Sequence, residues 1–187
     1  MVRSLFLPDQ GQQWASIDFS QQEPRILVHY AQAYNDSQKV GILKGVDEFV
    51  TNYRDNPKDT DFHTLVAEMA DIPRKTAKVI NLAMMYGMGV YKLSEQLDIS
   101  KDEAKELTTQ YHSRVPFVKG LQEVVMQRLN SRLSEGFLRS LLGRKLRFEL
   151  WEPDSYQMTK ALKREEAIAV HGENVRLKRA YTYKALN

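Results

Sequence analysis

The sequence predicts a fold of the α+β class that is mostly α-helical. Apolar residues recur at helical spacing in several stretches between residues 26 and 133, whereas residues 14–19 (WASIDF) and 146–150 (LRFEL) alternate between apolar and polar side chains. The first pattern is typical of amphipathic helices and the second of half-buried strands. Hydrophobic residues make up 42% of the 187 residues, which is enough for a core in one or two domains.

The strand predicted over residues 14–19 brings a carboxylate to its end. Alternation puts Ile17 and Phe19 on one face and Asp18 on the other. An apolar helical run over residues 26–34 follows closely. A carboxylate in this position can hold a divalent metal, with a neighbouring backbone carbonyl as a further ligand. A surface aspartate at a helix entry is the alternative interpretation of Asp18.

The start of that helix has two candidate positions. Ser20 and Glu23 match the S-x-x-E pattern of a capping box. A helix capped by Ser20 would place Pro24 at its fourth position, where proline removes the first backbone hydrogen bond. We therefore expect the helix to begin near Glu23 and Pro24.

Residues 74–89 (RKTAKVINLAMMYGMG) predict a helix with an ordered face. Asp71 and Pro73 stand where an entry signal belongs, and Gly87 and Gly89 can adopt the backbone that ends a helix. Two cations and then two flat or apolar side chains follow each other at intervals of four residues: Arg74, Lys78, Leu82 and Tyr86. This order suits a nucleotide, because cations hold phosphates and flat or apolar groups contact sugar and base. An ordinary amphipathic helix with solvated cations is the alternative.

The remaining elements follow from helical spacing, caps and breaks. Ser100 and Glu103 form a capping box, and the Val115-Pro116 step ends one helix and starts another. The expected helices cover residues 46–54 within a connection over 35–60, and then 61–70, 101–111, 117–133 and 159–170, with a strand over 146–150.

Composition limits the function classes. No cysteine is present, so disulfides and thiolate zinc sites are excluded, and a cytoplasmic location is the expectation. We expect no membrane association, because no stretch approaches the roughly 18 to 20 apolar residues of a membrane span and residues 1–10 lack a signal-peptide run. The net charge is only +3, but residues 138–187 hold 11 Lys or Arg against 6 Asp or Glu. Such a surface favours a nucleic-acid backbone, with a merely solvated basic face as the alternative.

Two of these segments resemble sequence motifs of one enzyme family. Residues 18–25 (DFSQQEPR) resemble motif A of the family A (polymerase I-like) DNA polymerases, and residues 74–89 resemble their motif B. Residues 61–64 (DFHT) resemble the segment that opens the fingers helix before motif B. Residues 136–145 (GFLRSLLGRK) resemble the hairpin after the fingers, and 184–187 (KALN) resemble the start of the next palm helix.

The resemblance implies the fingers and part of the palm of a right-hand polymerase fold. Residues 1–40 would form a palm segment with motif A, residues 41–135 the fingers with motif B, and residues 136–187 the return to the palm through a hairpin and a helix. The family's His-Asp-Glu motif, whose aspartate is a second metal ligand, is absent. We therefore expect a polymerase fragment that is inactive without the second carboxylate, the thumb and the rest of the palm.

The resemblance also assigns roles to individual residues. Asp18 would be catalytic and, with the carbonyl of Phe19, would bind one of two Mg²⁺ ions that serve phosphoryl transfer from a deoxynucleoside triphosphate to a primer 3′ end. Glu23 would be the steric gate that excludes a ribose 2′-hydroxyl. The other expected nucleotide contacts are Arg74, Lys78, His63, Leu82 and Tyr86, and the expected contacts to primer-template DNA are Lys75, Arg144 and Lys145.

Structural roles remain open for several of these residues. His63 on a helix can be a packed or capping residue, Lys75 can be solvated, and Tyr86 can belong to the core. Leu82 stands where the family usually has an aromatic ring, so stacking worth about 1 kcal/mol is expected to be lost and nucleotide capture to be weaker. Pro24 replaces the usual aliphatic residue. These departures favour a viral polymerase acting in a host cytoplasm.

Two other functions are compatible with parts of the sequence. A non-catalytic nucleic-acid or partner-binding module could retain the polymerase-like surface, and in it Asp18 would be dispensable. A single-subunit RNA polymerase relative shares the palm architecture. Glu23 argues against this last alternative, because an RNA polymerase should not block the 2′-hydroxyl.

Overall fold

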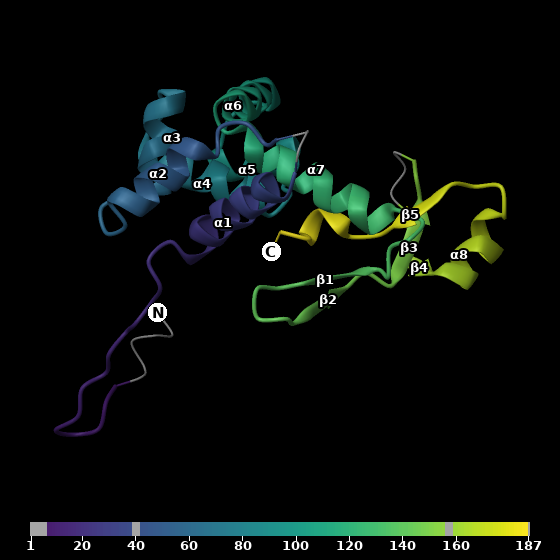
Figure 1. The fold of residues 1–187 in the computed structure, drawn as a ribbon, viewed down its shortest axis with the longest axis horizontal. Coiled ribbons are helices and arrows are strands. Elements are labelled where there is room, and N and C mark those ends of the chain that lie inside the picture. The colour runs from purple at the N-terminus through teal and green to yellow at the C-terminus, as the bar shows by residue number, and fades with distance from the viewer. Residues whose placement is uncertain (1–6, 39–41, 156–158, 187) are drawn as a thin grey trace.

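The computed structural model describes residues 7–38, 42–155 and 159–186 and confirms a mixed, mainly helical fold (Figure 1). A body of helices occupies one end of the molecule, and short strands with one helix occupy the other. The helices are α1 (Gln22–Ser37), α2 (Asp47–Asp55), α3 (Phe62–Ala70), α4 (Arg74–Met85), α5 (Val90–Leu97), α6 (Lys101–Arg114), α7 (Pro116–Asn130), α8 (Arg164–His171) and the 3₁₀ turn η2 (Thr182–Lys184). The strands are β1 (Phe137–Arg139), β2 (Lys145–Arg147), β3 (Leu150–Pro153), β4 (Leu162–Lys163) and β5 (Leu177–Arg179).

The helical body is held by one hydrophobic core to which α1 to α7 all contribute. At its centre Phe49 of α2, Phe62 of α3 and Phe117 of α7 are fully buried. The ring centroid of Phe49 lies 4.8 Å from that of Phe62 and 5.4 Å from that of Phe117. The consecutive helices α2 and α3 and the distant helix α7 are therefore fixed against each other by aromatic packing. None of the helices that the structure describes is both long and apolar enough to cross a membrane.

The expected helix boundaries are largely confirmed. Pro24 lies in the first turn of α1, whose N-cap is Gln21 rather than Ser20. Ser100 and Glu103 form the expected capping box of α6, and Pro116 opens α7 after the break. Helix α5 was not predicted, because its eight residues are too few to give a clear period.

The strands are shorter and more numerous than predicted. The single strand expected over residues 146–150 is divided between two sheets, because residues 145–147 pair with β1, residues 148 and 149 carry no regular structure, and Leu150 begins β3, which pairs with β4 and β5. β1 and β2 form an antiparallel hairpin, and β4, β3 and β5 form an antiparallel sheet with β3 in the middle. The helix expected over 159–170 begins only at Arg164, since Leu162 and Lys163 pair with β3.

The prediction of a strand over residues 14–19 is wrong. Residues 12–19 carry no regular secondary structure, and Ile17 is 92% exposed. A strand requires a neighbour to complete its hydrogen bonds, and no strand within the described residues pairs with this segment. Figure 1 shows it running away from the helical body at the start of α1.

The helical body is joined to the strands through Arg179 of β5. Its guanidinium donates to the backbone carbonyls of Leu129, Phe148 and Ser134 at 2.8 to 3.2 Å. Those carbonyls come from the end of α7, the segment before β3 and the turn before β1. The guanidinium lies directly over Gly136, which has a φ of +76°. Gly136 thus provides both the backbone turn and the space for Arg179.

We predict that Gly136→Ala destabilises the fold more than Gly143→Ala. Both glycines have a φ near +80°, so a side chain at either position costs about 1–2 kcal/mol of backbone strain. Only at Gly136 does the added Cβ displace the guanidinium of Arg179, whereas nothing lies within 4 Å of a Cβ at Gly143. The free energy of unfolding in urea, followed by circular dichroism, should fall by about 1–2 kcal/mol more for Gly136→Ala. Equal losses would show that Arg179 does not hold this junction.

Candidate functional site

Helix α4 presents the ordered face that the sequence predicts. Pro73 is its N-cap, and Asp71 instead ends α3 in a left-handed conformation with a φ of +54°. The inward face of α4 is buried in the core: Ala77, Ile80, Asn81, Ala83, Met84 and Met85. On the outward face Arg74, Lys78 and Tyr86 are exposed and Leu82 is half-buried. The two cations, the aliphatic Leu82 and the aromatic Tyr86 therefore form one accessible stripe along α4.

Arg74 is held at the start of this stripe by Asp61. The Arg74 Nε donates to Asp61 Oδ2 at 2.8 Å and the Nη2 donates to the same oxygen, while Nε also lies 3.2 Å from Thr64 Oγ1. The other oxygen, Asp61 Oδ1, accepts the backbone N–H of His63 at 2.9 Å and caps α3. Burial alone would raise the pKa of Asp61, but the hydrogen bonds from Arg74 and the α3 backbone outweigh it and lower the pKa. Asp61 thus stays ionised and fixes the Arg74 side chain, which remains 56% exposed.

His63 lies behind the stripe, paired with a buried amide. Its side chain is only 7% exposed, and its Nδ1 lies 2.8 Å from Asn81 Nδ2. Since the Asn81 N–H₂ donates, His63 Nδ1 is the acceptor and Nε2 is assigned the proton. Burial lowers the pKa of His63, and the charges of Arg74 and Lys78 lower it further against Asp61 and Glu23. His63 is therefore a neutral Nε2–H donor set among those charged side chains.

Glu23 and Tyr86 connect the two motif segments directly. The Tyr86 hydroxyl, at the end of the stripe, donates to Glu23 Oε1 at 2.5 Å. This hydrogen bond, with burial and the Glu23 charge, raises the pKa of Tyr86. Both side chains are exposed, so the contact is accessible to a ligand. Residues that are 63 positions apart in the chain thus meet at one end of α4.

Gln21 and Arg25, which lie in the motif A segment, anchor the start of α1. Gln21 Oε1 accepts the backbone N–H of Phe62 at 2.8 Å and the Tyr53 hydroxyl at 3.2 Å, and its Nε2 donates to the Thr60 carbonyl at 2.8 Å. Arg25 lies over the Tyr53 ring at 4.7 Å. Burial raises the pKa of Tyr53 to about 12, so its hydroxyl remains a donor. These contacts fix Glu23, between Gln21 and Arg25, relative to α3.

Asn81 is the site residue that sequence analysis missed altogether. It is fully buried, and its Oδ1 has no hydrogen-bond partner among the described residues. The available signal was an amide between the apolar Ile80 and Leu82, on a helix whose cations mark the outer face. Its contact with His63 could not be read from spacing, because it joins two helices.

Other predicted site residues are not brought to the stripe. Asp18 and Phe19 lie on the exposed extended segment, and among residues 7–38, 42–155 and 159–186 no three carboxylate or histidine side chains are clustered to hold a metal. Of the expected metal ligands, the described residues thus provide Asp18 and the carbonyl of Phe19, without a cluster of further ligands around them. Lys75 is exposed one position round α4 from Arg74, and Arg144 and Lys145 are exposed on the β1–β2 hairpin.

Cations and an aromatic hydroxyl on the accessible face of α4, with the neutral imidazole of His63 from α3 behind them, define a surface suited to a nucleotide. The family model described as DNA polymerase family A matches residues 1–171. The chain therefore belongs to DNA polymerase family A. Membership in a DNA polymerase family argues against the alternative that the chain is a relative of single-subunit RNA polymerases.

Known relatives agree with this membership. The chain is 32% identical over 193 residues to a DNA-directed DNA polymerase of Pseudomonas phage M6, with 85% of this chain and 28% of that protein covered. It is 28% identical over 146 residues to DNA polymerase I of Pseudomonas aeruginosa, covering 78% of this chain and 15% of that protein. The chain thus spans less than a third of the length of these relatives.

A solved structure supports the same fold. The polymerase domain of Pol1 from M. smegmatis, in complex with DNA primer-template and dNTP, matches with a TM-score of 0.51 and 26% identity. The match covers 75% of this chain and 23% of that one. The chain therefore has the fold of a segment of a polymerase domain.

We predict that His63 makes the stability of the chain depend on pH. Because its folded-state pKa lies below its ordinary value of 6.5, the unfolded chain binds more protons between these two values. The stabilising contribution is complete above pH 6.5 and is lost as the pH falls through the folded-state pKa. The free energy of unfolding should therefore decrease from pH 7.5 to pH 5, and His63→Gln should reduce this dependence.

His112 provides the matched comparison, since burial and Lys119 also lower its pKa and it lies on α6, away from the stripe. His63→Gln and His112→Gln should each remove part of the pH dependence, and the double variant should remove the sum. Proton NMR titration of the His63 ring gives its pKa directly. A His63 pKa at or above 6.5 would contradict the neutral state assigned to it.

Proposed function

We propose that the chain is the segment of a template-directed DNA polymerase that receives the incoming deoxynucleoside triphosphate. The observation that carries this proposal is the hydrogen bond between Tyr86 and Glu23, because it joins the two motifs at one end of the cationic stripe. Lys78 and Arg74 would bind the phosphates as cations. The sugar would then lie near Glu23 and Tyr86, where the carboxylate disfavours a ribose 2′-hydroxyl.

His63 contributes a neutral donor to the phosphates in this proposal. Its Nε2–H is oriented by Asn81, which accounts for a buried amide on the inner side of α4. Arg74 would exchange Asp61 for a phosphate oxygen when the nucleotide binds. Leu82 offers an aliphatic surface to the nucleotide in place of a ring.

The remaining catalytic roles belong to a longer polymerase. Asp18 would supply one carboxylate for Mg²⁺, and the second would come from the His-Asp-Glu motif, which this sequence lacks. Lys75, Arg144 and Lys145 would contact primer-template DNA. In that assembly residues 1–40 and 136–187 would be palm and residues 41–135 fingers, with two-metal phosphoryl transfer completed only with the rest of the palm and the thumb.

The proposal predicts that Asp18 is required for synthesis. In a chimera, residues 1–187 replace the equivalent segment of the Pseudomonas phage M6 polymerase, which is 32% identical. Primer extension with Mg²⁺ should be lost in the Asp18→Ala chimera and retained with Asp9→Ala, a carboxylate on the same exposed segment. Equal extension by both variants would reject the role of Asp18. A folded, DNA-binding chimera with no extension at all would favour the non-catalytic module.

The proposal also predicts nucleotide binding by the 187-residue chain itself. Lys78→Ala should weaken the binding of a fluorescent dATP analogue about five- to twentyfold, because a charged contact to phosphate is lost. Leu82→Phe should tighten binding about fivefold by restoring stacking. Lys105→Ala, an exposed lysine on α6, should change nothing. Unchanged anisotropy titrations for both Lys78→Ala and Leu82→Phe would exclude the stripe as the nucleotide site.

A further inference from the structure

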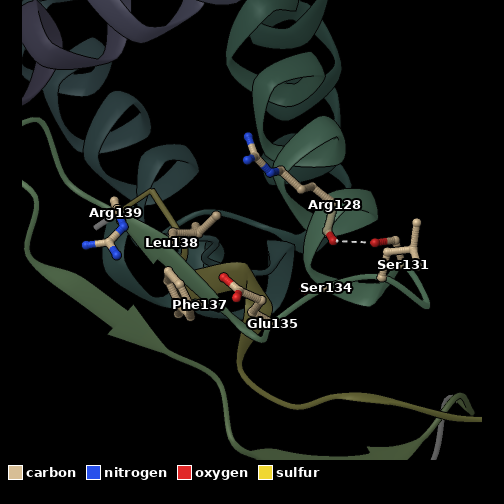
Figure 2. A pocket seen from close by; sticks show the side chains of 8 residues that line it. Arg128, Ser131, Ser134, Glu135, Phe137, Leu138 and Arg139 are labelled. Atoms are coloured by element: carbon tan, nitrogen blue, oxygen red, sulfur yellow. Dashed lines mark hydrogen bonds between the residues drawn. The ribbon is translucent and has the colours of Figure 1, made fainter.

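A hollow of about 630 Å³ lies between the end of α7 and strand β1, apart from the α4 stripe (Figure 2). Its size falls within the roughly 300–1,000 Å³ of typical ligand pockets. Two arginines line it from different elements, Arg128 in the last turn of α7 and Arg139 at the end of β1. We propose that this hollow binds an unpaired nucleotide of a DNA strand, with the two arginines on its phosphates, and this rests on the proposed polymerase function.

The charge of the hollow favours a phosphate backbone. Arg128 and Arg139 are both exposed, and neither forms an ion pair within the part of the chain that the structure describes. Arg139 makes one long side-chain hydrogen bond, at 3.2 Å to the Gly143 carbonyl, and keeps its remaining donors. Glu135 is the only acid among the described residues that line the hollow, so these residues carry a net positive charge. A phosphate is therefore expected at the arginines and a base amino group near Glu135.

The hairpin extends this positive surface beyond the hollow. The register pairs Arg139 with Lys145 and Phe137 with Arg147, so these four side chains share one face of the β1–β2 ladder. The Lys145 Nζ lies 4.2 Å from the centre of the Phe137 ring. Arg139, Lys145 and Arg147 thus lie on the same face of the hairpin as the Phe137 ring. A strand whose unpaired nucleotide enters the hollow would lay its next phosphates on this face.

The apolar part of the lining provides a surface for a base. Leu133 is 96% exposed, and Phe137 forms another part of the wall. An exposed leucine gains nothing from folding here, whereas a flat base placed against it would be removed from water on that side. Ser131 and Ser134 bring hydroxyl groups to the same wall, and these can bond the edge of a base.

The test compares three DNA ligands with the full 187-residue chain by fluorescence anisotropy: a blunt duplex, the same duplex with a single-stranded 5′ extension, and an eight-residue oligo-dT. Arg128→Gln and Arg139→Gln should each weaken binding of the two ligands with unpaired nucleotides about three- to tenfold and leave the blunt duplex unchanged. The salt dependence, as the slope of log K against log salt, should fall by about 0.7 for each arginine removed. Arg132→Gln is the matched control, because Arg132 is exposed in the turn that follows α7 but is not among the residues that line the hollow.

Competition by dTMP separates a strand from a free nucleotide. The proposal expects oligo-dT to compete far better than dTMP, because several phosphates contact the hairpin face. Full competition by dTMP, or losses equal to those of Arg132→Gln, would overturn the assignment of the hollow. If the two arginine variants weaken all three ligands equally, the hollow is a general DNA contact and the proposal for an unpaired nucleotide is wrong.

The test of the hollow can be separated from the test of nucleotide binding by the α4 stripe. Lys78→Ala should weaken dATP binding and leave oligo-dT binding intact, and the arginine variants should do the reverse. A chain that binds oligo-dT through Arg128 and Arg139 but binds no dATP would contradict the proposed function alone. Binding of dATP with no arginine-dependent binding of oligo-dT would contradict the hollow alone.

Discussion

The arrangement of the site depends on one carboxylate, that of Asp61, which serves two helices at once. One oxygen caps α3 and the other holds the guanidinium of Arg74 at the start of α4. The pair is more than half exposed on the arginine side, so its contribution to stability is small, about 0–1 kcal/mol. Its consequence is geometric, because α3 and α4 are aligned and Arg74 is oriented before any ligand arrives. Removing the Asp61 carboxylate would leave the positive charge of Arg74 on α4, but the Arg74 side chain would no longer be held in one orientation.

The two motif segments are joined by a second set of contacts, which starts from Gln21. That side chain binds the backbone before and at the start of α3, and so sets the position of α1 and its Glu23. Glu23 then meets Tyr86 from α4. α1 is thus linked to α3 and α4, which lie further along the chain, through polar contacts at the accessible end of a common core. An aromatic core fixes the helices, and these hydrogen bonds determine which side chains face each other.

Local signals allowed much of this to be predicted from the sequence. A cap, a break and a four-residue period are properties of neighbouring residues, and they gave the start of α1, the capping box of α6, the beginning of α7 and the outward face of α4. The strand over residues 14–19 failed for the opposite reason. Alternation describes a segment that could form a strand, but the hydrogen bonds that make one come from another part of a chain. The pairing of His63 with Asn81 could not be predicted for the same reason, because it joins side chains of two different helices.

Asp18 and the hollow beside β1 are inferred from different kinds of observation, the first from a sequence motif and the second from the fold. Asp18 is defined by its motif, and no cluster of three or more carboxylate or histidine side chains forms a metal site within the described residues. The hollow carries no motif, yet its two arginines and its exposed leucine are brought together by the fold from α7, the following turn and β1. Apolar side chains left exposed beside cations on both α4 and the hairpin contribute nothing to the core. Such a surface is best explained by the strand and the nucleotide that it would bind.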